Sequence, residues 1–128
     1  MSEPNYAKAS LVYQLLKDYH AITPDLKALR AGSLLPEPAE AARSRATGWF
    51  NQVFLLWMAQ LIDLSVLRWV ATRAGATLYL AHVAPLDAAI RNARAQADGR
   101  DEVPLGEHPV ERFWAEYAEG RIQVPPSA

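Results

Sequence analysis

The side chains best suited to acid–base or metal chemistry are scattered along this 128-residue sequence. Each of the three histidines, His20, His82 and His108, lacks a second ligand three or four residues away on the same predicted helix. Two ligands on one helix face need that spacing. The chain has no cysteine, which excludes thiolate zinc sites, thiol nucleophiles and disulfides. We therefore predict no metal site and no cofactor.

The carboxylates and small residues do not form a catalytic pattern either. Glu111, Glu116 and Glu119 mostly face away from the aromatic stripe of the last predicted helix, which is typical of a solvated face rather than an acid–base pair. The six glycines are scattered, so no phosphate-binding loop is formed. No serine or threonine has the flanking pattern of a nucleophile elbow. The sequence predicts no catalytic residue, and we expect a protein that is not an enzyme.

The longest apolar stretch is GWFNQVFLLWMAQLIDLSVLRWVATRAG, residues 48–75. On a helical wheel its apolar side chains occupy nearly every angle, and a helix that is apolar all round is buried all round. As one helix it would be about 40 Å long, more than its short neighbours are expected to cover. Because large exposed apolar patches are rare on monomers, we expect a partner, most simply a second copy of the chain, to cover part of it. Full burial within one monomer is the alternative.

The expected partner interface consists of the large apolar residues of this stretch: Trp49, Phe50, Trp57, Leu64 and Trp69. Tryptophans surrounded by leucines and valines are also typical of a protein core. They are less typical of a surface that stacks nucleic-acid bases or of a ligand pocket.

Two charged residues, Asp63 and Arg68, interrupt the apolar stretch. A buried carboxylate requires a cationic partner. Arg68 lies on the wrong face of the predicted helix, so we expect a lysine or arginine of another element or of a partner chain to reach Asp63. The alternative is an exposed strip that Asp63 shares with Gln60.

A bilayer is a third environment for this stretch. Residues 53–71 are long enough to span one. However, Asp63 would lie near the middle, at a cost of about 2.5–3.5 kcal/mol. A membrane is therefore a disfavoured partner.

The segment VATRAGATLYLAHVA, residues 70–84, resembles the helix-turn-helix of LacI-type repressors, in which V-A-x-x-A-G-V-S precedes the recognition helix. The matching residues are Val70, Ala71, Ala74, Gly75, Ala76 and Thr77. The resemblance implies a turn at Gly75, a recognition helix capped by Thr77, and a small DNA-associated regulator that uses residues 64–97. The residues implied to contact nucleic acid are Arg73, Thr77, Arg91 and Arg94. The sequence departs from the family where Leu78, Tyr79 and Leu80 replace polar residues that would face the bases.

Charge is distributed unevenly along the second half of the chain. Residues 66–100 hold five arginines against two aspartates, and residues 101–119 hold six acids against one arginine. We predict that these two segments lie near each other and neutralise each other. Asp87 and Arg91 also have the i,i+4 spacing of a pair within one helix.

The elements that must position these residues are helices. Periodicity predicts an all-α fold, a small bundle of about five helices around a long central apolar helix at about 48–74. Within one domain over 1–128, helices are expected at 6–20, 24–31, 39–74, 85–98 and 109–119, with a flexible tail at 120–128. Residues 76–84 favour β structure locally but have no second strand to pair with, so helix and extended segment both stay open.

Composition supports a cytoplasmic protein. Basic and acidic residues number 13 and 14, for a formal net charge of −1, so a chain-wide field that attracts nucleic acid is absent. There is no secretory signal, the initiator methionine suggests a whole small protein, and alanine- and arginine-rich usage suggests a bacterial or phage gene.

We expect a non-enzymatic helical interaction or regulatory module, self-associating as a homodimer. The alternatives are the DNA-associated regulator and a membrane-associated small protein.

Overall fold

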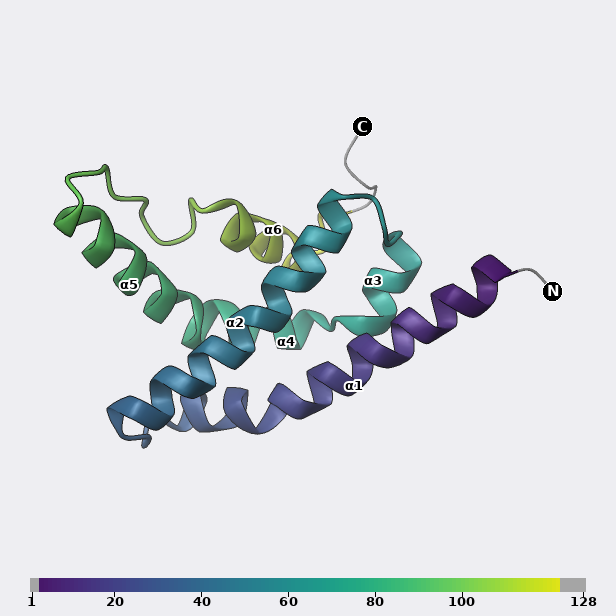
Figure 1. The fold of residues 1–128 in the computed structure, drawn as a ribbon, viewed down its shortest axis with the longest axis horizontal. Helices are drawn as coiled ribbons and strands as arrows, with labels where there is room; N and C mark the ends of the chain where they lie inside the picture. The colour runs from purple at the N-terminus through teal and green to yellow at the C-terminus, as the bar shows by residue number, and fades with distance from the viewer. Residues whose placement is uncertain (1–2, 123–128) are drawn as a thin grey trace.

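The computed structural model describes residues 3–122, and within them it contains six α-helices and no strand (Figure 1). The helices are α1 (Glu3–Ala31), α2 (Pro36–Met58), α3 (Leu64–Val70), α4 (Arg73–His82), α5 (Ala84–Ala97) and α6 (Pro109–Ala118). The prediction of a small all-α bundle is confirmed. Residues 76–84, for which helix and extended structure were both open, lie largely in α4. Most of the tail predicted at 120–128 falls outside the described residues.

Two helices form the centre of the bundle, α2 and the short α4, and each packs against α1, α5 and α6 as well as against the other. Figure 1 shows the long α1 and α2 joined by a short loop, with α3 beside the N-terminal half of α1 and α5 and α6 on the other side of α2. α5 and α6 agree closely with the predicted helices at 85–98 and 109–119.

The prediction of one continuous apolar helix at 48–74 is wrong, because the chain turns twice within it. α2 ends at Met58, and Gln60 adopts the left-handed φ of 60°. The carboxylate of Asp63 then accepts a hydrogen bond from the Val66 amide at 2.9 Å and caps α3. The hydroxyl of Thr72 accepts from the Gly75 amide at 2.9 Å and caps α4. These caps satisfy backbone donors that a continuous helix would bond internally, so three helices each bury a face of their own.

The first two predicted helices, at 6–20 and 24–31, are instead one helix that runs through Pro24. Proline removes one backbone donor and disfavours a helix interior. Here Ile22 and Leu26, on either side of Pro24, are buried in the core, so packing holds the helix together. α2 also starts earlier than predicted, at Pro36, because proline is favoured in the first turn of a helix.

The core is an aromatic cluster contributed by three helices. Trp49 and Phe50 of α2, Tyr79 of α4 and Trp114 of α6 are all buried. The indole N–H of Trp49 donates to the Leu15 carbonyl of α1 at 3.0 Å. The indole N–H of Trp114 donates to the Phe50 carbonyl at 3.2 Å. These bonds satisfy the only polar atoms of these two buried indole side chains.

Gly75 lies at a close approach between α4 and α1, and we expect Gly75→Ala to lower the free energy of unfolding by about 1–3 kcal/mol, the usual cost of overpacking. A Cβ at this position would lie 2.6 Å from the Tyr19 hydroxyl and 3.0 Å from the Thr72 hydroxyl. The Tyr19 ring is fixed against Trp49, with centroids 4.7 Å apart, so it cannot move aside freely. Urea unfolding measures the change.

The matched control is Gly48→Ala, in the exposed part of α2, where a Cβ would meet no atom within 4 Å. There alanine should raise stability by about 0.5–1 kcal/mol through helix propensity. Equal effects of the two substitutions would contradict the tight approach at Gly75.

Candidate functional site

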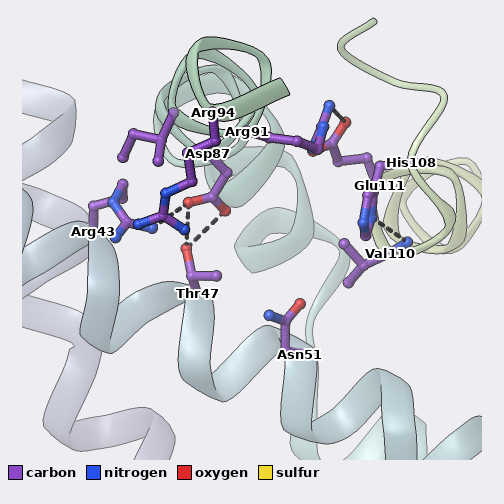
Figure 2. Close-up of a pocket in the computed structure, with 10 residues that line it drawn as sticks. Arg43, Thr47, Asn51, Asp87, Arg91, Arg94, His108, Val110 and Glu111 are labelled. Carbon is purple, nitrogen blue, oxygen red and sulfur yellow. Dashed lines mark hydrogen bonds and ion pairs between the residues drawn. The ribbon is translucent and has the colours of Figure 1, made fainter. Parts of the chain in front are cut away.

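A polar pocket of about 210 Å³ lies between α2, α5 and the start of α6 (Figure 2). We call it the arginine pocket, and its lining residues are Arg43, Thr47, Asn51, Asp87, Ile90, Arg91, Arg94, His108, Val110 and Glu111. The α2 residues are spaced four apart, and the α5 residues three or four apart, so each set occupies one face of its helix.

The first charge cluster in the arginine pocket is centred on Asp87. Its carboxylate accepts hydrogen bonds from Arg43 at 2.6 Å and from the Thr47 hydroxyl at 2.7 and 2.9 Å. Arg43 also donates two hydrogen bonds to Glu40, at 2.6 and 2.9 Å. The hydrogen bonds to Glu40, together with those to Asp87, raise the pKa of the Arg43 guanidinium above its usual value. This network joins α2 to α5.

The second cluster is a buried ion pair between Arg91 and Glu111, whose side chain is only 1% exposed. Glu111 accepts from Arg91 at 2.7 Å and from the Gly106 amide at 2.8 Å. Arg91 also donates to the Val103 carbonyl at 2.8 Å. The pair therefore joins α5, α6 and the loop between them.

The prediction that Glu111 belongs to a solvated face is wrong. Glu111 faces α5, where Arg91 neutralises it, whereas Glu116 is half-buried and Glu119 is exposed. The predicted neutralisation between residues 66–100 and 101–119 is therefore confirmed for one pair, whereas Arg100 pairs with Asp98 within its own segment.

A second surface is an apolar groove between α1 and α3, of about 410 Å³. We call it the α1–α3 groove, and its lining residues are Lys8, Ala9, Val12, Tyr13, Leu16, Val66 and Trp69. The side chains of Trp69 and Tyr13 are 71% and 67% exposed.

The groove exists because α1 carries two apolar stripes. Leu15, Ile22 and Leu26 face the core, while Tyr13 and Leu16 lie on the outer side.

The structure divides the predicted partner interface between the core and the surface. Trp49, Phe50 and Trp57 are covered by the protein's own helices, so they cannot contact a partner while the fold is intact. Leu64 is half-buried and packs against the core. Trp69 is exposed.

Asp63 has the predicted cationic partner but not the predicted burial. Its side chain is 55% exposed, and Lys8 of α1 lies 3.1 Å from its carboxylate. Hydrogen bonds from the Val66 amide, the Ser65 hydroxyl and Lys8 lower the pKa of Asp63 to about 2. Within residues 3–122 no ion pair joins Asp63 to Arg68, which is exposed. Asp63 therefore acts as a helix cap that also ties α3 to α1.

The residues implied to contact nucleic acid do not gather on one recognition helix. The implied turn at Gly75 is wrong, since Gly75 lies within α4 and Thr72 rather than Thr77 is the cap. Thr77 donates to the Arg73 carbonyl at 2.9 Å.

Arg73 and Arg91 are held at opposite ends of α6. Arg73 donates to the Ala118 carbonyl at the C-terminal end of α6, and Arg91 binds Glu111 in the first turn of α6. Arg94 is exposed beside the arginine pocket.

The arginine pocket was not predicted as a site, although its spacing was visible. Arg43, Thr47 and Asn51 recur every fourth residue on α2, which marks a polar stripe along one face of the helix. The sequence alone does not show that α5 lies opposite this stripe and completes the pocket.

Among residues 3–122, no three or more histidine, cysteine, aspartate or glutamate side chains are grouped so that they could hold a metal ion. Within the same range no helix has both the length and the apolar character needed to cross a membrane. Comparison of the sequence with protein families and with curated proteins, and of the chain with solved structures, gives no match.

Proposed function

We propose that the protein is a non-enzymatic helical interaction module that self-associates through the α1–α3 groove. The observation that carries the proposal is the exposure of Trp69 and Tyr13 around an apolar groove. Exposed aromatic side chains beside a hollow are the usual anchors of a protein interface.

The spacing of the outer stripe favours a helix as the occupant. Tyr6, Ala9, Tyr13 and Leu16 are separated by three, four and three residues, which is the spacing of a coiled-coil seam. All four are exposed on α1. Such a seam packs against another helix rather than against an extended peptide.

A second copy of this chain is the partner that these features fit best. In a two-fold dimer the same patch must complement itself. The α1–α3 groove provides both a hollow and, in Trp69, a protruding side chain at its edge. The neighbouring Lys8 is already paired with Asp63, so two copies can approach without bringing unpaired like charges together at this point.

Multi-angle light scattering across micromolar concentrations tests the proposal. The expected result is a mass that rises towards twice the 14.2 kDa of the chain, and Trp69→Glu should shift the protein to monomer. An introduced carboxylate in an apolar interface is left without a partner and typically costs several kcal/mol.

The matched control is Leu35→Glu, because Leu35 is 73% exposed, like Trp69, but lies before α2 and outside the groove. This variant should self-associate like the parent protein. Circular dichroism checks that both variants remain helical. A parent protein that stays monomeric throughout, or equal association by Trp69→Glu, would refute self-association through this groove.

A further inference from the structure

We propose that the arginine pocket binds a small oxyanion, a carboxylate or phosphate group, through hydrogen-bond donors that the fold leaves without protein partners. This inference goes beyond self-association and involves a different surface, between α2, α5 and α6 (Figure 2).

Each carboxylate oxygen in the pocket already accepts at least one hydrogen bond. One carboxylate oxygen of Asp87 accepts from Arg43 and Thr47, and the other accepts from Thr47. The two oxygens of Glu111 accept from Arg91 and from the Gly106 amide. A ligand that offers mainly donors, such as an ammonium group, would therefore meet carboxylates that are already hydrogen-bonded.

Several donors, in contrast, remain free. The Nε atom of Arg91 is buried and has no hydrogen-bond partner among the described residues. No hydrogen bond or ion pair within residues 3–122 engages the guanidinium group of Arg94 or the amide of Asn51. The Nδ1 atom of His108 accepts from the Val110 amide at 3.4 Å, so the neutral ring carries its proton on Nε2 and offers a donor there.

Figure 2 shows how these donors surround an open space. Arg94 lies with Asp87 and Arg43 on one side of the pocket and His108 lies with Glu111 on the other, while Asn51 points from α2 towards the region between them. A buried donor without a partner has lost its hydrogen bonds to water without compensation. An acceptor-rich ligand that satisfies several of these donors would recover part of that loss.

A further donor lies close to the same charged residues. The hydroxyl of Tyr79 is fully buried and has no hydrogen-bond partner among the described residues. Burial raises the pKa of this hydroxyl and the negative charges of Asp87 and Glu111 raise it further, but Tyr79 does not line the arginine pocket.

The size of the pocket agrees with a small anion, and its net charge does not oppose one. The lining holds three arginines against two carboxylates, so one positive charge is in excess when His108 is neutral. Glu40, which binds Arg43 from outside the lining, balances this excess, so the charged cluster as a whole has no net charge. Selection therefore depends on the free donors more than on net charge. The volume of about 210 Å³ is below the roughly 300–1,000 Å³ of pockets for drug-sized ligands.

Isothermal titration calorimetry at constant ionic strength tests the proposal, with inorganic phosphate and acetate as separate probes and chloride as the balancing anion. We expect saturable binding of one anion per chain. Binding of phosphate, of acetate or of both supports the oxyanion site, and the preferred probe identifies the ligand class.

Arg94→Ala should weaken this binding at least tenfold, because Arg94 supplies the most accessible free guanidinium group. The control is Arg100→Ala, which removes the same charge from an exposed position outside the pocket. It should leave the affinity within twofold. The titrations are repeated with Trp69→Glu, so that self-association cannot account for the result. No saturable binding of either anion, or equal weakening by both arginine variants, would overturn the proposal.

Discussion

Trp114→Ala should lower the free energy of unfolding by about 3–5 kcal/mol, the range for deleting a large aromatic side chain from a core. The Trp114 side chain is 0% exposed. Its ring packs against Phe113, Phe50 and Tyr117 with centroids 4.9, 5.1 and 5.5 Å apart. The substitution also leaves the Phe50 carbonyl without the indole donor that now lies 3.2 Å away. The loss of packing and of this hydrogen bond therefore act together.

The matched control for this prediction is Trp69→Ala, which removes the same side chain from the surface. Because Trp69 is exposed, its replacement should change monomer stability by no more than about 0.5 kcal/mol. Urea unfolding at low protein concentration measures both variants and keeps self-association from adding to the stability of the parent protein. A loss below 1 kcal/mol for Trp114→Ala would show that the core does not depend on the aromatic cluster.

The helices that follow local signals closely were the predictable part of the fold. α5 and α6 each carry a proline in the first turn and end just before the sequence reaches glycine, so start and stop are both encoded locally. The helical class also follows from periodicity. These features do not depend on any distant residue.

The breaks in the helix predicted at 48–74 were missed because a helical wheel places all residues on one continuous axis. It therefore cannot show where one helix ends and the next begins. Residues 48–74 are apolar at every angle only when they are placed on one axis. Asp63 and Thr72 are good N-cap residues, but a single helical wheel places both of them inside one continuous helix rather than at the starts of two others. The two turns give α3 and α4 separate buried faces, and this is how a short chain covers its own apolar residues.

The α1–α3 groove was missed for a related reason. The sequence shows Val12, Tyr13 and Leu16 as part of one apolar side of the first helix. It does not show that Leu15, Ile22 and Leu26 already supply the face that packs on the core. Only the neighbouring helices decide which of two stripes is buried.

The arginine pocket shows what local spacing cannot decide. Asp87 and Arg91 have the spacing of a pair within α5, yet each binds a residue of another helix instead. Arg43, the partner of Asp87, is 44 residues away in the sequence. Segment charges predicted that Arg91 would lie near an acid, but not which acid, because that choice depends on the packing angle of α6 against α5.

Glu111→Ala should lower the free energy of unfolding by about 3–5 kcal/mol, because it leaves a largely buried arginine without its counter-charge. Arg91 is 21% exposed, so water can only partly replace the lost carboxylate. The Gly106 amide loses its acceptor at the same time, which should loosen the loop between α5 and α6. Urea unfolding measures the loss, and amide hydrogen exchange should report faster exchange at Gly106.

Two further variants separate charge burial from simple loss of a contact. Asp98→Ala breaks the exposed pair between Asp98 and Arg100 and should cost no more than about 1 kcal/mol. The double variant Arg91→Met with Glu111→Leu removes both buried charges and should be more stable than Glu111→Ala, because no isolated charge remains. The double variant could instead lose as much free energy of unfolding as the single variants Arg91→Met and Glu111→Leu lose when added together. In that case the cost of Glu111→Ala does not arise from an unpaired Arg91. The loop contacts at Val103 and Gly106 would then be the main contribution of this cluster to stability.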